Sequence, residues 1–144
     1  MNIYAGSDHR GFTLKNKLIE WLQTKQYHVF DCGNKHHDPN DDWNDFALEV
    51  VKHVIAEPDS IGLLLCGSGV GMSIAANRYK GIRAAVCFGP EQAKHARVAD
   101  HANIISLPAE YITEDTAKVI VKAFIEAQPS EAERYIRRMK KLDM

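Results

Sequence analysis

The apolar run Ile61–Cys66 and the glycine-rich loop after it constrain the fold more than any other part of the chain. Six consecutive residues without a polar side chain are typical of a strand that is covered on both faces in a parallel sheet. Gly67, Gly69 and Gly71 follow at once, and a helix-like segment comes next. This order predicts a strand, a tight turn and a helix N-terminus, where backbone N–H groups can bind an anion.

Strand-like apolar runs alternate with amphipathic segments along the chain. Leu14, Leu18, Trp21 and Leu22, for example, recur at helical spacing. Further strands are expected at Asn2–Ser7, Tyr27–Cys32, Ile82–Phe88 and Asn103–Leu107, and helices at Thr13–Lys25, Phe46–Ala56, Pro90–Val98 and Glu114–Ala127, with a last basic helix opened by Pro129-Ser130-Glu131. Short connections between alternating strands and helices predict a doubly wound α/β sandwich around a parallel sheet of about five strands.

Composition limits the classes of protein to which the chain can belong. The 144 residues, 45% of them hydrophobic, suit a single domain over residues 1–144. No apolar run is long enough to span a bilayer and no basic n-region opens the chain, so we expect no membrane partner and no signal peptide. Cys32, Cys66 and Cys87 lack metal-type spacing and predict reduced thiols in a cytoplasmic protein. A net charge of -1 argues against a nucleic-acid partner.

Chemistry-bearing residues follow two of the predicted strands. In doubly wound sheets ligands bind at the carboxyl ends of the strands, so Asp8 and His9 are expected to meet Cys66 in one crevice. At a helix N-terminus a cysteine can form a thiolate, which acts as nucleophile or base. Each of these features also has a purely structural interpretation. Cys66 can be a small buried thiol, the glycine-rich loop can be a tight turn between strand and helix, and Asp8 can simply cap the first helix. Cys32 and Cys87 are interpreted as core residues.

Basic side chains cluster in the last helix-like segment of the chain, and two histidines lie near the end of the fourth expected helix. Arg134 and Arg138 are four residues apart and share a helix face, which suits them to clamp a phosphate, although a solvated basic face is the alternative. His95 and His101 flank the end of the fourth expected helix, where either can be a general acid or a cation matched to the helix dipole.

Four segments carry a resemblance to a known family. They are Gly6–Phe12 with Leu14-Lys15, Leu65–Asn77, Gly81–Ala84 and Ala102–Ile104. With them, and nearly end to end, the chain resembles the type B ribose-5-phosphate isomerases, which belong with the galactose-6-phosphate and allose-6-phosphate isomerases in one family of sugar-phosphate isomerases. The resemblance implies a Rossmann-like three-layer αβα sandwich with an extra C-terminal helix. It also implies a homodimer or dimer of dimers with active sites built from both subunits, and neither metal nor cofactor.

The resemblance also implies roles for individual residues. Cys66 would be the base that moves a proton between C1 and C2 of the open-chain sugar. N–H groups for the enediolate oxygen would come from Gly67, Ser68, Gly69, Val70 and Gly71. Asp8 would bind sugar hydroxyls or help to open the ring, and His9 would contact the phosphate together with Arg134 and Arg138 of the partner subunit. Ser68 replaces the threonine common in the family and keeps its hydroxyl group.

Some positions depart from the family pattern. Ala99-Asp100 stands where the family has a His-Asn pair, Tyr135 replaces a second histidine, and Asp42-Trp43-Asn44 replaces Asp-Tyr-Pro. We expect Asp100 and Trp43 to reshape the sugar pocket. Because the family histidine is missing, we expect His101 or Asp8 to open the sugar ring, or the enzyme to use the small fraction of substrate that is already open-chain.

These changes leave more than one function open. The favoured one is cofactor-independent isomerisation of ribose 5-phosphate to ribulose 5-phosphate. The alternatives are an isomerase of allose or galactose 6-phosphate, a catalytically weak sugar-phosphate-binding protein and, with least support, a nucleotide-binding domain that uses Asp31.

Overall fold

The computed structural model describes residues 1–144. Each of its five strands is followed by a helix, and a sixth helix ends the chain. The strands are β1 (Asn2–Ser7), β2 (His28–Asp31), β3 (Ile61–Cys66), β4 (Ala84–Val86) and β5 (Ile104–Pro108). The helices are α1 (Phe12–Thr24), α2 (Trp43–Ala56), α3 (Val70–Ala76), α4 (Pro90–Ala99), α5 (Glu114–Glu126) and α6 (Glu133–Lys140). None of these helices is long and apolar enough to cross a bilayer.

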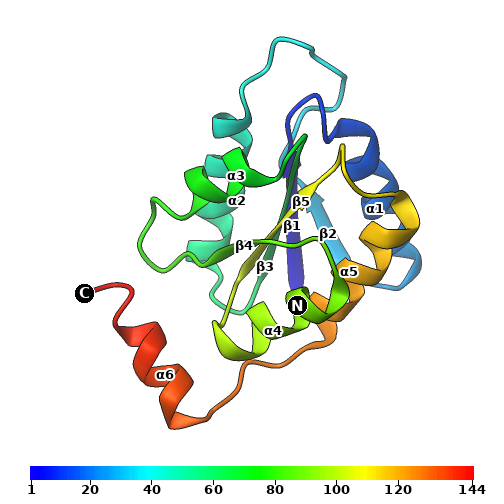
Figure 1. Ribbon diagram of the computed structural model, residues 1–144. Helices are drawn as coiled ribbons and strands as arrows, with labels where there is room; N and C mark the ends of the chain where they lie inside the picture. Colours follow the sequence, from blue (N-terminus) through cyan, green and yellow to red (C-terminus); the bar gives the residue numbers. More distant parts are fainter.

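The strands form one parallel sheet in the order β2-β1-β3-β5-β4, which confirms the predicted five-stranded sheet. β3 lies at its centre, and all six of its residues are buried. The apolar run Ile61–Cys66 therefore forms the strand that is covered on both faces. Its carboxyl end, and those of its neighbours β1 and β5, lie at the top of Figure 1.

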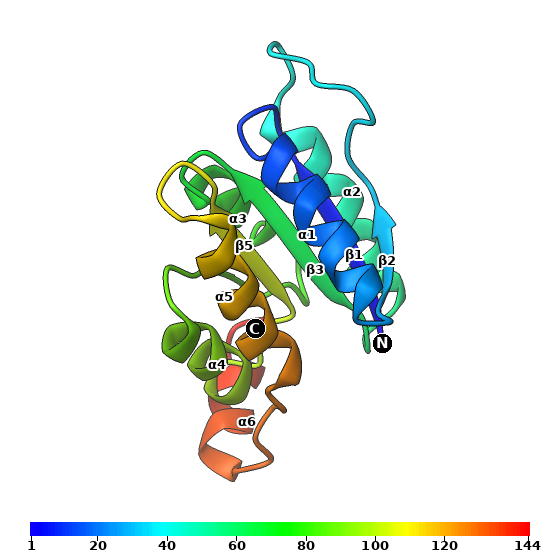
Figure 2. The same ribbon diagram turned by 90° about the vertical axis from the view of Figure 1, so that its right-hand side faces the viewer.

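Helices cover both faces of the sheet, so the molecule has the predicted three layers (Figures 1 and 2). Leu63 and Leu65 point into a core that α1, α4 and α5 complete with the sheet. Leu64 and Cys66 point to the other face, where α2 and α3 pack. Because side chains alternate along a strand, Cys66 must lie on the α2–α3 side.

The predicted boundaries of β1 and β3 are confirmed, whereas the expected strand Ile82–Phe88 is too long. Only its central residues, Ala84–Val86, form β4. Ile82 donates its N–H to the carbonyl of Tyr79 in a turn, at 3.1 Å. Phe88 donates its N–H to Oε1 of Gln92, at 2.9 Å. Both ends of the apolar run therefore leave the ladder, as edge strands can do.

The remaining boundaries shift by a few residues. β2 is shorter than Tyr27–Cys32, α2 begins at Trp43 rather than Phe46, and α6 begins at Glu133. The Thr113 side chain caps α5 by accepting the N–H of Thr116, at 3.2 Å.

α6 extends away from the body of the molecule at the edge where the strands begin (Figures 1 and 2). None of its residues is buried. The chain after it turns back, and Oδ1 of Asp143 accepts the N–H of Gly81 at 3.1 Å. An eight-residue helix has little stability of its own in water, so this arrangement leaves α6 in need of a packing partner.

Candidate active site

The carboxyl ends of β1 and β3 bring the two predicted site segments together. Ser7 pairs with Leu65 in the sheet register. The N–H of Asp8 then donates to the carbonyl of Leu65, at 3.3 Å. Asp8 and His9 therefore lie beside Cys66 although more than fifty residues separate them along the chain.

The sulfur of Cys66 accepts a backbone hydrogen bond from the loop that follows it. The residue is only 4% exposed, and the N–H of Gly69 donates to its Sγ at 3.1 Å. Gly69 has a φ of 74°, and a Cβ atom there would lie 3.1 Å from backbone atoms of Leu107 and Pro108. The hydroxyl of Ser106 donates to the Gly69 carbonyl at 2.6 Å. The loop is thus fixed against β5 in a conformation that favours glycine, with an N–H dipole aimed at the sulfur.

Ser68 and Val70 complete this loop. Oγ of Ser68 accepts the N–H of Val70 at 3.2 Å, which leaves the hydroxyl hydrogen of Ser68 for another acceptor. Gly67 lies between Arg10 and Glu110, where a Cβ atom would meet the Arg10 side chain at 2.9 Å. Residues Gly67–Gly71 therefore form one turn at the sheet end, in which Gly67 and Gly69 are buried and Val70 is exposed.

Trp43 closes the α2 side of the loop. Its indole packs on Gly71 so closely that a Cβ atom at Gly71 would lie 3.1 Å from the ring. Trp43 also packs against the core to which Cys66 belongs. The structure thus places Trp43 beside the loop that follows Cys66.

The Asp8 carboxylate is buried and oriented by a turn. Its Oδ1 accepts the N–H groups of Arg10 at 2.9 Å and Gly11 at 3.2 Å. The N-cap of α1 is Gly11, so Asp8 lies one turn before this helix, and its carboxylate holds the turn that leads into it. The turn leaves Oδ2 as the oxygen that no residue of the chain engages.

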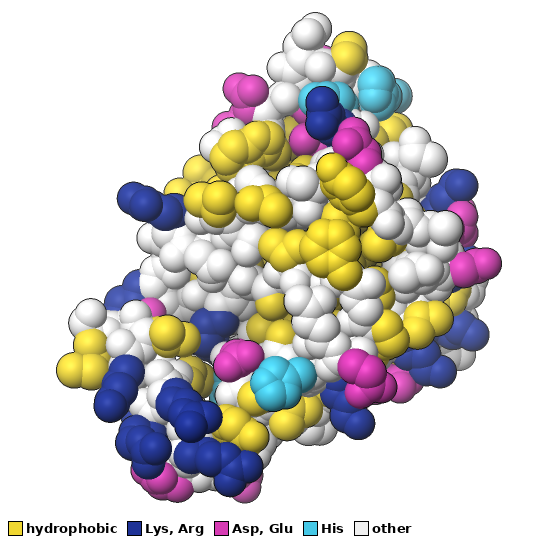
Figure 3. Space-filling model, in the orientation of Figure 1, with side chains coloured by type: hydrophobic (Ala, Val, Ile, Leu, Met, Phe, Trp, Pro, Cys, Tyr) yellow, Lys and Arg dark blue, Asp and Glu magenta, His cyan; other side chains and the backbone are white.

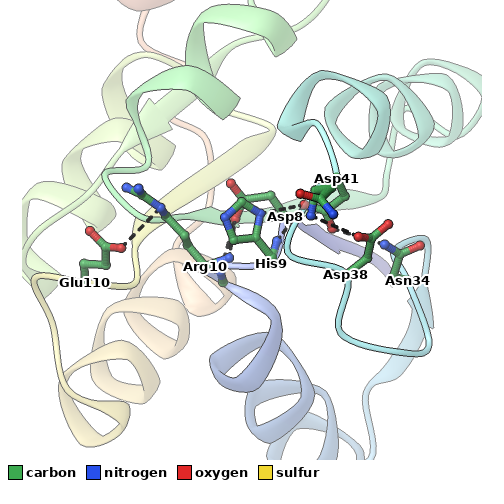
Figure 4. Close-up of polar contacts among 9 residues, drawn as sticks. Asp8, His9, Arg10, Asn34, Asp38, Asp41 and Glu110 are labelled. Atoms are coloured by element: carbon green, nitrogen blue, oxygen red, sulfur yellow. Dashed lines mark hydrogen bonds and ion pairs between the residues drawn. The ribbon is translucent and has the colours of Figure 1, made fainter.

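Three polar residues at this end were not anticipated from the sequence (Figure 4). Oδ1 of Asp41 lies 2.8 Å from Nδ1 of His9, and Nε of Arg10 lies 3.5 Å from Oε1 of Glu110. Asp41 lies in the polar segment 33–42, and nothing in the local pattern of that segment indicates a partner 32 residues away.

The other predicted site residues lie elsewhere in the chain. His101 precedes β5, and its Nε2 is 2.9 Å from the carbonyl of Ser130. Asp100 lines a cavity of about 660 Å³ between the residues after α3 and the C-terminal tail. Arg134 and Arg138 are exposed on α6, where basic side chains gather at the lower left of Figure 3. A single chain therefore does not bring these four residues to Cys66.

Comparison with known proteins decides the family. The model of the family described as Ribose/Galactose Isomerase matches residues 3–142. The chain belongs to this family. It is 41% identical over 142 residues to the probable ribose-5-phosphate isomerase B of Mycoplasma genitalium. The aligned residues make up 98% of this chain and 93% of that protein. It is 39% identical to a putative sugar phosphate isomerase of Rickettsia bellii, over 99% of this chain and 97% of the other.

Solved structures of the Ribose/Galactose Isomerase family share the fold. A crystal structure of a ribose 5-phosphate isomerase from Thermotoga maritima superposes with a TM-score of 0.94 at 42% identity and covers 99% of this chain and 97% of its own. Ribose-5-phosphate isomerase B of Mycoplasma genitalium, solved with bound ribulose-5-phosphate, gives a TM-score of 0.94 at 41% identity, over 98% and 93% of the two chains. The predicted family resemblance and fold class are confirmed.

The remaining thiols of this Ribose/Galactose Isomerase family member differ from Cys66 in their surroundings. Burial raises the pKa of Cys87 to about 11. Burial, with the Asp31 carboxylate second, raises the pKa of Cys32 to about 11. Cys87 is fully buried, as predicted, whereas Cys32 is only half-buried. Neither residue accepts a backbone N–H, so Cys66 is the thiol whose sulfur the fold provides with a donor.

Proposed function

We propose that the protein interconverts ribose 5-phosphate and ribulose 5-phosphate by proton transfer through an enediolate, without a cofactor. The observation that carries this proposal is the Gly69 N–H held 3.1 Å from the sulfur of Cys66, at a strand end that also presents Asp8 and His9. The relatives named ribose-5-phosphate isomerase B, one of them solved with bound ribulose-5-phosphate, support the choice of substrate.

Cys66 and its loop provide the two things that this reaction needs. The Cys66 thiolate removes the proton from C2 of the open-chain aldose, and the electron pair moves to the C1 carbonyl oxygen as an enediolate. The thiol then returns a proton to C1, while the C2 hydroxyl loses its proton to become the ketone and O1 takes up a proton to become the new hydroxyl. The proton on sulfur exchanges with solvent during this intermediate, which is why deuterium enters the sugar in D₂O. A positioned base contributes about 10²–10⁴-fold to such a step. Donors at the developing oxyanion contribute about 10²–10³-fold, and here they are the loop N–H groups and the Ser68 hydroxyl.

Asp8, His9 and Trp43 surround this centre with binding groups. The Oδ2 of Asp8 accepts a hydrogen bond from a sugar hydroxyl, and the His9 ring binds the phosphate. The indole of Trp43 takes up room beside Gly71, which favours a five-carbon substrate over allose or galactose 6-phosphate.

A panel of phosphosugars tests this function directly. Ribose 5-phosphate, allose 6-phosphate and galactose 6-phosphate are supplied in D₂O, and both product formation and deuterium at C2 are measured. Cys66→Ser should lose turnover by at least about 10²-fold, whereas the control Cys32→Ser should keep it, because only Cys66 lies at the loop. Tight binding without exchange would instead identify a sugar-phosphate-binding protein, and unchanged turnover by Cys66→Ser would exclude this thiol as the base.

The site is completed by a second copy of the chain. Arg134 and Arg138 lie on an exposed helix that has no core contact in its own chain, and Val70, Ile74 and Phe88 are exposed around α3 and the edge strand β4. In the proposed homodimer α6 packs on the partner, and its arginines reach the phosphate.

Mixing two inactive variants tests the shared site. Cys66→Ser and Arg134→Ala homodimers, denatured and refolded together, should regain about a quarter of the wild-type activity, because half of the dimers are mixed and each keeps one intact site. No recovery would show that each site is made by one chain.

Ring opening is assigned to His101 of the partner subunit, in place of the histidine that Ala99 replaces. The ring of His101 is held by the Ser130 carbonyl, at 2.9 Å, on the connection to α6. His101→Ala should slow turnover of the cyclic substrate while leaving binding unchanged. Equal rates for His101→Ala and the wild type would transfer this role to Asp8 or to the open-chain fraction.

A further inference from the structure

One carboxylate holds His9 by both its backbone and its ring (Figure 4). Oδ1 of Asp41 accepts the backbone N–H of His9 at 2.9 Å and lies 2.8 Å from Nδ1 of the imidazole. The Asp41 side chain is only 7% exposed, and that of His9 is 28% exposed. The Asp41 carboxylate is therefore largely shielded from water, whereas the His9 ring is partly open to it.

This contact fixes where the imidazole carries its hydrogen. An ionised carboxylate only accepts hydrogen bonds, so Nδ1 of His9 must be the donor. Nε2 has no hydrogen-bond partner within the chain, while His37 meets the ring edge-on at a centroid distance of 6.3 Å. The nitrogen left available to a ligand is thus Nε2.

Asp41 is itself held by a chain of partly buried polar contacts. Its Oδ2 accepts the side-chain amide of Asn34 at 3.1 Å, and the Asn34 carbonyl accepts Nζ of Lys15 at 3.1 Å. Lys15 is fully buried on α1, and its ammonium group also donates to both oxygens of Asp31, at 2.7 and 2.8 Å. Hydrogen bonds therefore fix the polar loop after β2 at Asn34 and Asp41. These two residues connect Lys15 of α1 to His9.

We propose that Asp41 is a positioning residue that keeps the hydrogen of His9 on Nδ1 and directs Nε2 to the substrate phosphate. The proposal rests on the proposed function for the role of His9, and Asp41 itself does not touch the substrate. When Nε2 donates to a phosphate oxygen, the ring carries a positive charge, and the Asp41 carboxylate supplies the charge-assisted hydrogen bond on its other side. The loop after β2 thus contributes to phosphate binding through His9.

Three variants separate positioning from a general effect on the loop. Asp41→Ala removes the acceptor, Asp41→Asn keeps an acceptor but removes the charge, and Asp38→Ala removes a carboxylate from the same loop. Asp38 is exposed, and its side chain accepts only the N–H of Asn40, at 2.9 Å. It is therefore the matched control for charge and location.

Kinetics and ¹⁵N NMR of the imidazole provide the two readouts. Asp41→Ala should raise KM for ribose 5-phosphate by about tenfold and change kcat by less than about twofold, the size expected for one charge-assisted hydrogen bond. Its neutral His9 ring, assigned with a His9→Gln variant, should lose the Nδ1–H tautomer that the wild type shows. Asp41→Asn should retain that tautomer with an intermediate KM, and Asp38→Ala should match the wild type in both measurements.

The outcomes distinguish this proposal from the proposed function. If Asp41→Ala and Asp38→Ala agree in KM and in the ¹⁵N shifts of His9, the positioning role is refuted, even when Asp41→Ala is less stable. If the wild type isomerises no phosphosugar, the proposed function fails. The tautomer of His9 in wild type and Asp41→Ala, titrated with inorganic phosphate as the probe, then still decides whether Asp41 positions the ring.

Discussion

Replacement of Gly69 by alanine tests how far the fold and the chemistry depend on one backbone conformation. Gly69 has a φ of 74°, and its N–H donates to the sulfur of Cys66 at 3.1 Å. A Cβ atom at this position would stand 3.1 Å from the carbonyl carbon of Leu107 and from the nitrogen of Pro108. Both are backbone atoms of the end of β5, so no flexible side chain can move aside.

The loss of stability is the sum of two separable contributions. A left-handed conformation costs alanine about 1–2 kcal/mol relative to glycine. Forcing a methyl group into a packed site costs about 1–3 kcal/mol more. Gly69→Ala should therefore lower the free energy of unfolding by about 2–5 kcal/mol. A shift of the loop that relieves the contact of the new methyl group with β5 would also move the N–H of residue 69 away from Cys66. Because this donor would be lost, kcat should fall by about 10²-fold.

Gly81 is a matched control within the same chain. It has a φ of 85°, yet a Cβ atom there would meet nothing within 4 Å. Gly81→Ala should thus show the conformational cost alone, about 1–2 kcal/mol, with kcat unchanged. Urea unfolding followed by circular dichroism measures both free energies, and isomerisation of ribose 5-phosphate measures kcat. Equal destabilisation by the two substitutions would refute the close packing of Gly69 on β5, and an unchanged kcat for folded Gly69→Ala would refute the catalytic importance of its N–H.

Two further predictions concern Lys15 and Cys32. Lys15→Met should lower the free energy of unfolding by about 2–3 kcal/mol, less than for a fully buried pair because the Asp31 side chain is 29% exposed and can regain water. Lys17→Met on the same helix, which breaks an exposed pair with Glu114, should cost under about 1 kcal/mol, and equal losses would contradict the importance of burial. The pKa of Cys32, raised to about 11, predicts that its alkylation by iodoacetamide accelerates about tenfold per pH unit between about pH 8 and 10, followed by peptide mass spectrometry. A rate that levels off near about pH 9 would contradict this shift.

Features that depend on local pattern were predictable from the sequence. The unbroken apolar run gave β3 its correct bounds, Ile61–Cys66, because a strand covered on both faces needs an apolar side chain at every position. The contact of Asp8 with the end of β3 followed from a general rule, since parallel strands end at the same edge of a sheet.

Features that depend on distant partners were not predictable. The strand predicted over Ile82–Phe88 is longer than β4 because the N–H groups at its two ends bond outside the sheet. The N–H of Ile82 donates to Tyr79, and that of Phe88 donates to Gln92. Asp41 belongs to a polar loop whose local pattern is the same whether it is solvated or, as here, bonded to His9. A polar residue shows its type in the sequence, whereas its partner is set only when the chain folds.

The position of β5 separates the predicted site into two groups of residues. Pro108 at its carboxyl end pairs with Cys66, whereas His101 and Asp100 precede its first residue, Ile104. The strand alone spans about 13 Å, so side chains at its two ends cannot act on one substrate. There are two possibilities for His101, Arg134 and Arg138. They act on a substrate bound beside Cys66 of another copy of the chain, or they take no part in the reaction. Specific activity that falls on dilution, together with dissociation seen by analytical ultracentrifugation, would favour the first arrangement, whereas full activity from a monomer would require the second.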